Sequence, residues 1–264
     1  MKKLATLLTT LLAGSVLLTG CGNSSKNSKT ITIGATSNPH AIILEQVKPI
    51  LAKEGYTLEI KEFDDYALLN PALDKGDLDA NFFQHVPYLQ EFNKSKGTDL
   101  VAVQKVHIEP MGVYSKKIKN IKDVPDGAEI TIPADPSNGS RALKLLAKAG
   151  LFTVPDKEVL AVGDIKDNPK KLKITEVDAK QLTNTLQDVT LSVINSNYAL
   201  EGKLNPVKDA LLTEDSNSPY ANVIAVKKGH ENDEKIKALD KAITSPEIKK
   251  FIEDKFGGAV VPAF

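Results

Sequence analysis

The residue best suited to bind a charged small molecule is Arg141, the only arginine among 34 basic residues. Its guanidinium is planar and always charged, and it can hold a carboxylate through two parallel hydrogen bonds, which a lysine cannot do. The arginine follows Asp135-Pro136-Ser137-Asn138, a sequence typical of a strand that turns into a helix. Free backbone N–H groups and the positive dipole end at a helix start also attract anions. We therefore predict that Arg141 binds an anionic ligand group; the alternative is an arginine in a surface ion pair.

Two asparagines stand at positions where a ligand could meet the chain. Asn195 follows the apolar run Leu191-Ser192-Val193-Ile194, and Asn222 follows Ser218-Pro219-Tyr220. An amide both donates and accepts hydrogen bonds, which suits the ammonium and carboxylate groups of an amino acid. Either asparagine alone is also a common turn residue. Their shared placement at strand ends or crossings makes both candidates for ligand binding.

The segment 63–89 gathers aromatic and polar side chains. After a predicted helix at 66–75 and Gly76, the chain reads Asn81-Phe82-Phe83-Gln84-His85 and soon reaches Tyr88. Aliphatic residues would suffice for a core, so these side chains indicate a binding surface; the alternative is a strand with Phe82 in the core and its polar neighbours in a loop. Consecutive strand residues point to opposite faces, so Phe82 is predicted to lie in the core.

The motifs of common catalytic and metal sites are missing. There is no Gly-x-Ser-x-Gly segment and no phosphate-binding glycine loop. Cys21 is the only cysteine, and His40, His85, His107 and His230 stand in unrelated sequence contexts. We therefore predict no catalysis, no metal and no cofactor. Two other functions are alternatives. A lipoprotein enzyme acting on cell-wall or peptide substrates would need a nucleophile, a metal or an acid pair, and a structural or adhesive lipoprotein would have only a vestigial pocket.

Periodicity and turn signals predict an α/β protein in two blocks. Strands are expected at 30–36, 57–63, 81–85, 100–103, 129–133, 172–176, 189–194 and 222–226. Helices are expected at 39–53, 66–75, 87–96, 138–149, 179–187, 197–201, 232–243 and 246–256. The sheets should be largely parallel, and the chain should cross between the blocks near 111–115 and 218–224. Ligands of such folds bind at strand ends or between domains.

The first residues predict export and anchoring. Met1-Lys2-Lys3 precedes an uncharged apolar run from Leu4 to Leu18, too short for a membrane span, and Gly20-Cys21 follows. Residues 1–20 are therefore expected to be a signal peptide, and 21–29 a polar tether. Leu18-Thr19-Gly20-Cys21 resembles the lipobox of bacterial lipoproteins, which implies a lipid on Cys21. With 34 acidic and 34 basic residues, the chain has no basic excess to indicate nucleic-acid binding.

Motifs spread along the chain resemble the methionine-binding lipoproteins of the NlpA type. They are residues 63–89, Ser115-Lys116-Lys117-Ile118, Pro133-Ala134-Asp135-Pro136-Ser137-Asn138, 161–173, Val193-Ile194-Asn195 and Ser218-Pro219-Tyr220-Ala221-Asn222. The resemblance covers essentially the whole mature chain. It implies a two-lobed, type II-like periplasmic-binding-protein fold with a ligand cleft between the lobes. Lobe 1 would comprise 30–112 plus 223–264, and lobe 2 residues 113–222, joined by two hinge crossings.

The resemblance also implies a function and a set of ligand contacts. The protein would be a lipid-anchored monomer on the extracytoplasmic face of the cell membrane, delivering L-methionine, and D-methionine as a second option, to the permease and ATPase of an ABC importer. The alternative ligand is a methionine-containing dipeptide or another amino acid. Tyr66, Phe83, His85 and Tyr88 would line the side-chain pocket. Arg141 would bind the carboxylate, with Asn138, Asn195 and Asn222 beside the amino-acid backbone.

This chain departs from the family pattern at three places. Phe82 stands where relatives often have a small residue, Ile108-Glu109-Pro110 where an aromatic residue before proline is common, and Gly139-Ser140 precedes the arginine. Since some relatives take methionine-containing dipeptides, we expect these departures to bear on ligand size.

Overall fold

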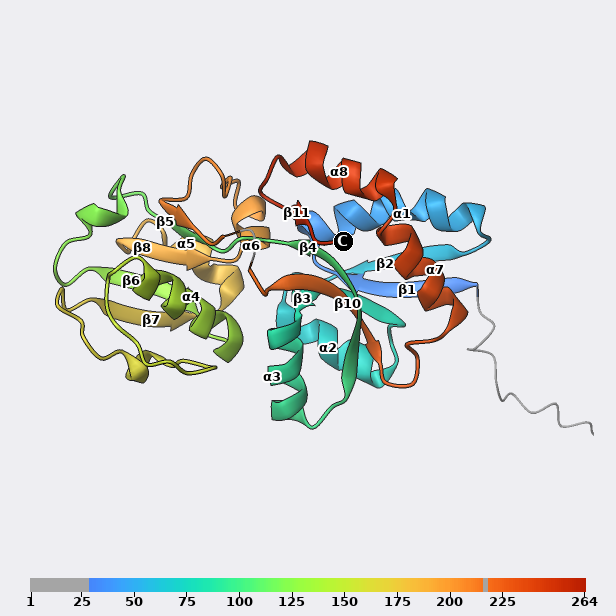
Figure 1. The fold of residues 1–264 in the computed structure, drawn as a ribbon, viewed down its shortest axis with the longest axis horizontal. Coiled ribbons are helices and arrows are strands. Elements are labelled where there is room, and N and C mark those ends of the chain that lie inside the picture. Colours follow the sequence, from blue (N-terminus) through green and yellow to red (C-terminus); the bar gives the residue numbers. More distant parts are fainter. Residues whose placement is uncertain (1–28, 216–217) are drawn as a thin grey trace, which may run out of the picture.

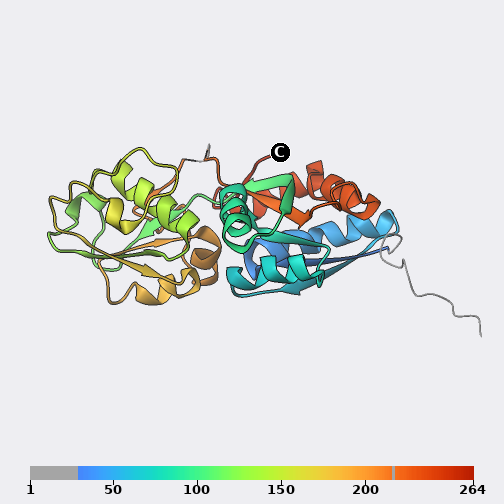
Figure 2. The same cartoon turned by 90° about the horizontal axis from the view of Figure 1, so that it is seen from below.

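The computed structural model describes residues 29–215 and 218–264, which form two mixed β-sheets, each with helices on both faces (Figure 1). Figure 2 shows the sheets side by side from a perpendicular direction. The predicted signal peptide (1–20), Cys21 and most of the tether (21–29) lie outside the described residues. Within the described residues, no helix has the length and apolar character needed to cross a membrane.

The first sheet has six strands in the order β11-β4-β10-β3-β1-β2. They are β1 (Thr30–Ala35), β2 (Thr57–Glu62), β3 (Ala80–His85), β4 (Leu100–Ile108), β10 (Ala221–Lys227) and β11 (Val261–Pro262). Its helices are α1 (Ile42–Lys53), α2 (Tyr66–Lys75), α3 (Val86–Lys96), α7 (Glu234–Ile243) and α8 (Pro246–Phe256). The two C-terminal helices therefore pack with the N-terminal part of the chain.

The second sheet has five strands in the order β7-β6-β8-β5-β9. They are β5 (Gly112–Tyr114), β6 (Glu129–Pro133), β7 (Lys173–Val177), β8 (Leu191–Ile194) and β9 (Leu212–Thr213). Its helices are α4 (Pro136–Lys148), α5 (Leu182–Thr185) and α6 (Ser196–Glu201), with short 3-10 turns between them. The chain passes between the sheets after β4 and again before β10. The predicted lobe boundaries at 112/113 and 222/223 stay a prediction; β5 begins at Gly112 and β10 at Ala221.

The sheets are less parallel than the sequence analysis expected. The pairs β1–β2, β1–β3, β6–β7 and β6–β8 are parallel. However, β10 runs antiparallel to both β3 and β4, and β5 runs antiparallel to both β8 and β9. The difference arises because β5 and β10 are the strands that follow the two crossings, and each enters its sheet from the opposite end.

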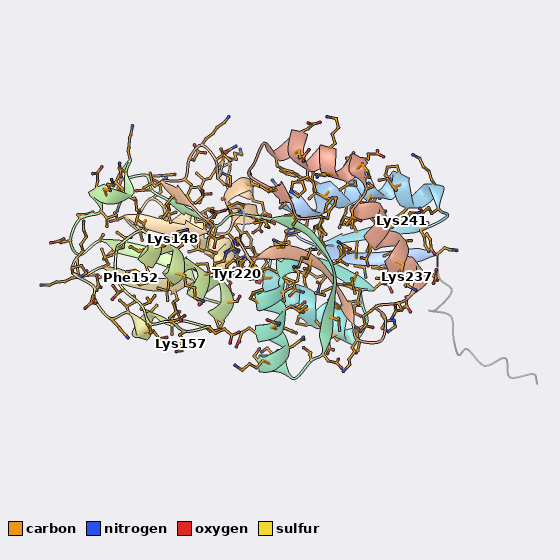
Figure 3. The ribbon with its side chains drawn as sticks, viewed as in Figure 1. Lys148, Phe152, Lys157, Tyr220, Lys237 and Lys241 are labelled. Atoms are coloured by element: carbon orange, nitrogen blue, oxygen red, sulfur yellow. The ribbon has the colours of Figure 1, made fainter. Side chains whose placement is uncertain are left out.

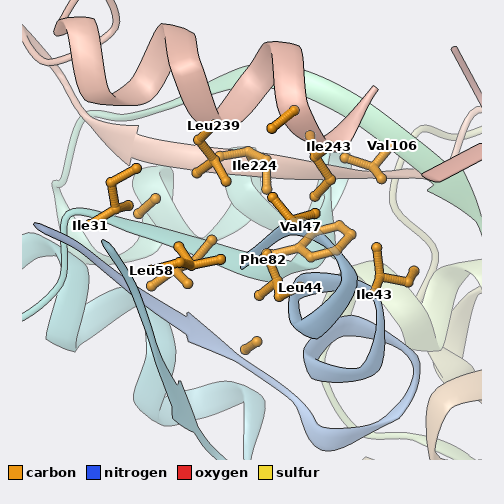
Figure 4. Close-up of a cluster of buried hydrophobic side chains, with 14 of the residues drawn as sticks. Ile31, Ile43, Leu44, Val47, Leu58, Phe82, Val106, Ile224, Leu239 and Ile243 are labelled. Carbon is orange, nitrogen blue, oxygen red and sulfur yellow. The ribbon is translucent and has the colours of Figure 1, made fainter. Parts of the chain in front are cut away.

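The largest core lies between the first sheet and the helices α1, α7 and α8 (Figure 4). Phe82 is fully buried there among aliphatic side chains such as Leu44, Val47 and Ile224, which confirms the prediction that it belongs to the core. Helices α2 and α3 cover the opposite face of the sheet, where Leu73 and Leu89 pack against Leu100 and Ala225. In the second half, α4 packs against one face of its sheet. The short helices α5 and α6 pack against the other face.

Two predicted helices differ from the structure. The helix expected from Pro39 begins at Ile42, because the backbone of Asn38 is extended (φ −128°, ψ 129°) and no side chain caps the preceding π-helical turn at Ser37–Ala41. The helix expected over 179–187 is only a 3-10 turn followed by the four-residue α5. Polar and β-branched residues in that segment (Thr183, Asn184, Thr185) favour a short helix.

Candidate ligand-binding site

A cavity lies where the two halves of the molecule meet, a common place for ligand sites in two-domain folds. Both sheets and the first crossing contribute to its walls. Its lining comprises Tyr66, Phe83, Gln84, His85, Tyr88, Glu109, Asn138, Arg141, Asn195, Ser196, Asn197 and Asn222. All eight residues that the sequence analysis selected for ligand binding are in this set. Their roles toward a ligand stay a prediction.

Helix α2 and strand β3 hold the aromatic wall through a buried network of amides. Asn70 of α2 and Gln84 of β3 exchange two hydrogen bonds, of 2.8 and 2.7 Å. Asn81 joins the network by donating to Asn70 and accepting from Gln84. Satisfied buried polar networks of this kind fix a unique arrangement. Tyr66, the first residue of α2, is therefore held in a defined position relative to Phe83.

Tyr66, Phe83 and Tyr88 form a triangle of aromatic rings. The centroids are 5.6 Å apart for Tyr66–Phe83, 5.7 Å for Phe83–Tyr88 and 5.9 Å for Tyr66–Tyr88. These separations are typical of favourable aromatic pairs. The triangle presents a polarisable apolar surface to the cavity.

His85 is buried in its neutral form. Its Nδ1 accepts a hydrogen bond from the backbone N–H of Tyr88 (3.2 Å), and its Nε2 donates to Oδ1 of Asn138 (3.0 Å). Burial and the charge of Arg141 together lower the pKa of His85 to about 3, although the hydrogen bond to Asn138 acts in the opposite direction. The imidazole therefore links β3 to α4 as an uncharged group.

Arg141 lines the cavity, as expected for a ligand-binding arginine, but it also forms an ion pair, as in the alternative considered for it. Its side chain is only 3% exposed, and Nε and Nη2 form a two-pronged ion pair with the carboxylate of Glu214, with a Nε–Oε1 distance of 2.8 Å. Nη2 also donates to the backbone oxygen of Glu109 (2.8 Å). The guanidinium lies 4.3 Å above the ring of Tyr220, which Figure 3 places between the two halves. Arg141 thus ties together the two chain crossings, and only Nη1 has no partner among the described residues.

The start of α4 is not free to bind an anion, which corrects the expectation from sequence. The carboxylate of Asp135 accepts a hydrogen bond from the backbone N–H of Asn138 (2.8 Å) and also from its side chain. The backbone N–H of Gly139 donates to the backbone oxygen of Asp135 (2.8 Å). An aspartate directly before the helix serves as its N-cap and occupies these donors.

The structure joins His40, His107 and Glu109, which the sequence analysis treated as unrelated. Oε1 of Glu109 lies 2.8 Å from Nε2 of His107 and 3.2 Å from Nε2 of His40. Nδ1 of His40 lies 2.6 Å from the hydroxyl of Thr36, which orients the imidazole ring. The ligand atoms of the three residues lie within 4.8 Å of one another, close enough to ligate a metal ion. Nε2 of His107 donates a hydrogen bond to this carboxylate, and Nε2 of His40 donates to Oδ1 of Asn222 (3.3 Å).

Several polar atoms around the cavity have no partner among the described residues. The donors are Nη1 of Arg141, Nδ2 of Asn197 and Nδ2 of Asn222. The acceptors are Oδ1 of Asn195 and Oε2 of Glu109. Two of these atoms, Nδ2 of Asn197 and Oδ1 of Asn195, are fully buried. Buried polar atoms are nearly always hydrogen-bonded, so these two indicate a ligand that carries both an acceptor and a donor. By contrast, Oδ1 of Asn138 already accepts from both His85 and Asn195.

The two halves contact each other around the cavity. Tyr66 donates to Oδ1 of Asn197, and its ring lies 4.8 Å from that of Tyr198. Lys180 of the second half pairs with Asp65, the residue directly before Tyr66, at 2.7 Å. The structure therefore shows the junction in a closed arrangement.

Sequence reasoning missed Glu109, Asn197 and Glu214. Glu109 carried one signal, namely an acid that directly precedes a proline after an apolar strand. Asn197 and Glu214 lie in segments with no distinctive pattern. Their roles depend on partners far away in the chain, Tyr66 and Arg141, so the contacts become visible only in the folded protein.

Comparisons with known proteins agree with this architecture. Residues 31–264 match the family described as NlpA lipoprotein. A methionine-binding lipoprotein, MetQ, of Bacillus subtilis is 44% identical over 95% of this chain and 94% of its own length. A nutrient-binding protein from Burkholderia cenocepacia, solved with bound methionine, is 45% identical with a TM-score of 0.87, over 89% of this chain and 100% of that one. An ABC-transporter periplasmic substrate-binding protein from Coxiella burnetii is 43% identical with a TM-score of 0.86, over 88% and 100% of the two chains. This chain therefore belongs to the NlpA lipoprotein family and has its two-lobed substrate-binding fold.

Proposed function

We propose that this protein captures L-methionine outside the cytoplasm and delivers it to the permease and ATPase subunits of an ABC importer, without catalysing a reaction. The observation that carries the proposal is the pairing of an aromatic triangle with unpartnered polar donors and acceptors in one closed cavity. A thioether next to aromatic rings gains about 0.3–1.5 kcal/mol from sulfur–aromatic contact. The names of the Bacillus, Burkholderia and Coxiella relatives support the same ligand and transporter class.

The proposed roles follow from the atoms that remain available. Tyr66, Phe83 and Tyr88 contact the methionine side chain. Nη1 of Arg141 binds the carboxylate, assisted by Nδ2 of Asn222. Asn195 accepts from the amino group through Oδ1. His85 and Asn138 chiefly hold these groups in place, because most of their hydrogen-bonding atoms are already engaged.

The anchoring and the movement are part of the same proposal. A lipid on Cys21 would hold the protein at the extracytoplasmic face of the cell membrane as a monomer. Ligand binding would close lobe 1 (30–112 plus 223–264) on lobe 2 (113–222) by a hinge motion at the two crossings. Tyr66–Asn197 and Asp65–Lys180 are the contacts that the closed form gains. Replacing Cys21 by alanine should release the protein from the membrane fraction, which immunoblotting of fractionated cells would show.

Isothermal titration of the mature protein tests the ligand assignment. L-methionine should bind saturably, and norleucine, which replaces the sulfur by a methylene, should bind about 2- to 12-fold more weakly through loss of the sulfur–aromatic contacts. D-methionine and methionine-containing dipeptides complete the panel and decide between the alternative ligands. A protein that binds neither methionine nor its dipeptides would disprove the proposal.

A further inference from the structure

The carboxylate of Glu109 is a buried group that faces the proposed ligand cavity. Its side chain is 7% exposed, and the residue lies in the first crossing, directly after β4. Oε1 accepts a hydrogen bond from Nε2 of His107, and Nε2 of His40, which donates to Oδ1 of Asn222 (3.3 Å), lies 3.2 Å from it. Oε2 has no hydrogen-bond partner in the described part of the chain. One oxygen is thus fixed by the protein, and the other remains available on the cavity side.

This carboxylate is ionised and pairs with no lysine or arginine side chain of the described residues. Burial opposes its ionisation, but the two imidazoles that surround it outweigh burial and hold the pKa of Glu109 well below its usual range. Burial lowers the pKa of His107, so that imidazole is neutral at physiological pH. No lysine or arginine side chain of the described residues pairs with this carboxylate; Arg141 reaches only its backbone oxygen. A buried carboxylate oxygen without a partner is unfavourable, and because Glu109 lines the cavity, its Oε2 is suited to a positively charged ligand group.

The position of Glu109 is fixed from several sides. His40 is held by Thr36, and the ring of Phe82 packs edge-on against His40 at 4.6 Å and against His107 at 5.2 Å. The core residue Phe82 therefore supports the two histidines that orient the carboxylate. Such a support keeps Oε2 in one place for a ligand.

We propose that Glu109 binds the α-ammonium group of the ligand and restricts the site to molecules with a free amino group. The proposal rests on the proposed function for the identity of the ligand. Arg141 and Glu109 then provide the positive and the negative end of a site for a zwitterion, with the aromatic triangle for the side chain. The departure at Ile108-Glu109-Pro110 would then determine the charge that the cavity offers at this position, whereas its expected bearing on ligand size stays a prediction.

Three ligands separate the ammonium contact from the others in a titration experiment. L-methionine has both charged groups, 4-(methylthio)butanoate lacks the amino group, and L-methioninamide lacks the carboxylate. A charge-assisted hydrogen bond corresponds to roughly 10- to 150-fold in affinity. The unmodified protein should therefore prefer L-methionine over 4-(methylthio)butanoate by at least about tenfold.

The variant Glu109→Gln should bind methionine and methioninamide at least about tenfold more weakly than the unmodified protein does. Its affinity for 4-(methylthio)butanoate, which has no amino group, should be unchanged. The exposed Glu62→Gln is the matched control and should behave like the unmodified protein. Equal weakening for all three ligands, or for none, would overturn the role of Glu109. If Glu109→Gln does not fold, equal affinity of the unmodified protein for methionine and 4-(methylthio)butanoate overturns it as well. Failure to bind methionine at all would disprove the proposed function instead.

Discussion

Replacing Arg141 by alanine should destabilise the protein even without ligand. Arg141 is 3% and Glu214 11% exposed, and the pair shares two hydrogen bonds. Removing one partner of a buried ion pair leaves an uncompensated charge and costs about 3–5 kcal/mol. For a chain of this size, each kcal/mol lowers the melting temperature by about 2–4 °C. We therefore expect Arg141→Ala to melt roughly 6–20 °C lower than the unmodified protein.

A double variant separates this structural role from ligand binding. In Arg141→Met/Glu214→Gln no charge is left unpaired, and glutamine can still accept the hydrogen bond that Glu214 receives from the backbone N–H of Met111 (3.0 Å). Replacing both members of a buried ion pair is often nearly neutral. The double variant should therefore recover most of the lost stability while still failing to bind methionine.

Urea denaturation without ligand measures the first effect, and isothermal titration with methionine measures the second. The single variant Glu214→Gln is the control, because it keeps the guanidinium and its free Nη1. If Arg141→Ala unfolds at the same urea concentration as the unmodified protein, the ion pair does not stabilise the crossings. If the double variant binds methionine normally, Arg141 does not hold the carboxylate.

Three further predictions concern stability. The pKa of His85 is about 3 in the folded protein, so between pH 6.5 and 3 only the unfolded chain takes up a proton. The free energy of unfolding should therefore fall by up to about 1.4 kcal/mol for each unit by which the pH is lowered in this range. Urea denaturation of His85→Gln should show a shallower fall. Burial raises the pKa of Asp240 to about 6, and its Oδ1 has no partner among the described residues. Asp240→Asn should therefore stabilise the protein by roughly 1–2 kcal/mol at pH 7. This gain should disappear below about pH 4, where the carboxyl group is protonated in both the folded and the unfolded protein. A Cβ at Gly139 would lie 2.8 Å from the backbone oxygen of Pro133, so Gly139→Ala should lower the free energy of unfolding by about 1–3 kcal/mol. At the control position Gly163 a Cβ would meet nothing within 4 Å, so Gly163→Ala should leave the melting temperature unchanged.

Elements with strong local signals could be predicted from sequence. Helix α8 begins after Ser245, whose hydroxyl caps Ile248, and ends at Gly257 in the left-handed conformation, so both ends are encoded locally. Helix α2 is likewise bounded by its cap Asp65 and by Gly76. The start of α1 was misplaced because Ser37 lies in a cap-like sequence but does not cap the helix.

The site could be predicted only in part, for a related reason. Arg141 and the aromatic residues were recognisable from rarity, clustering and family resemblance. The ion pair of Arg141 with Glu214 and the close approach of His40 to Glu109 connect segments that are distant in the sequence. No local pattern specifies such contacts, because they depend on how β4, β10 and α4 are placed in space.

The guanidinium of Arg141 connects the ligand cavity to both chain crossings. It bonds Glu214 in one crossing and the backbone of Glu109 in the other, and its remaining nitrogen faces the cavity. A ligand that binds this nitrogen therefore acts through one side chain on both crossings. Ligand binding and the stability of the crossings therefore depend on one side chain, so a substitution of Arg141 alone alters both.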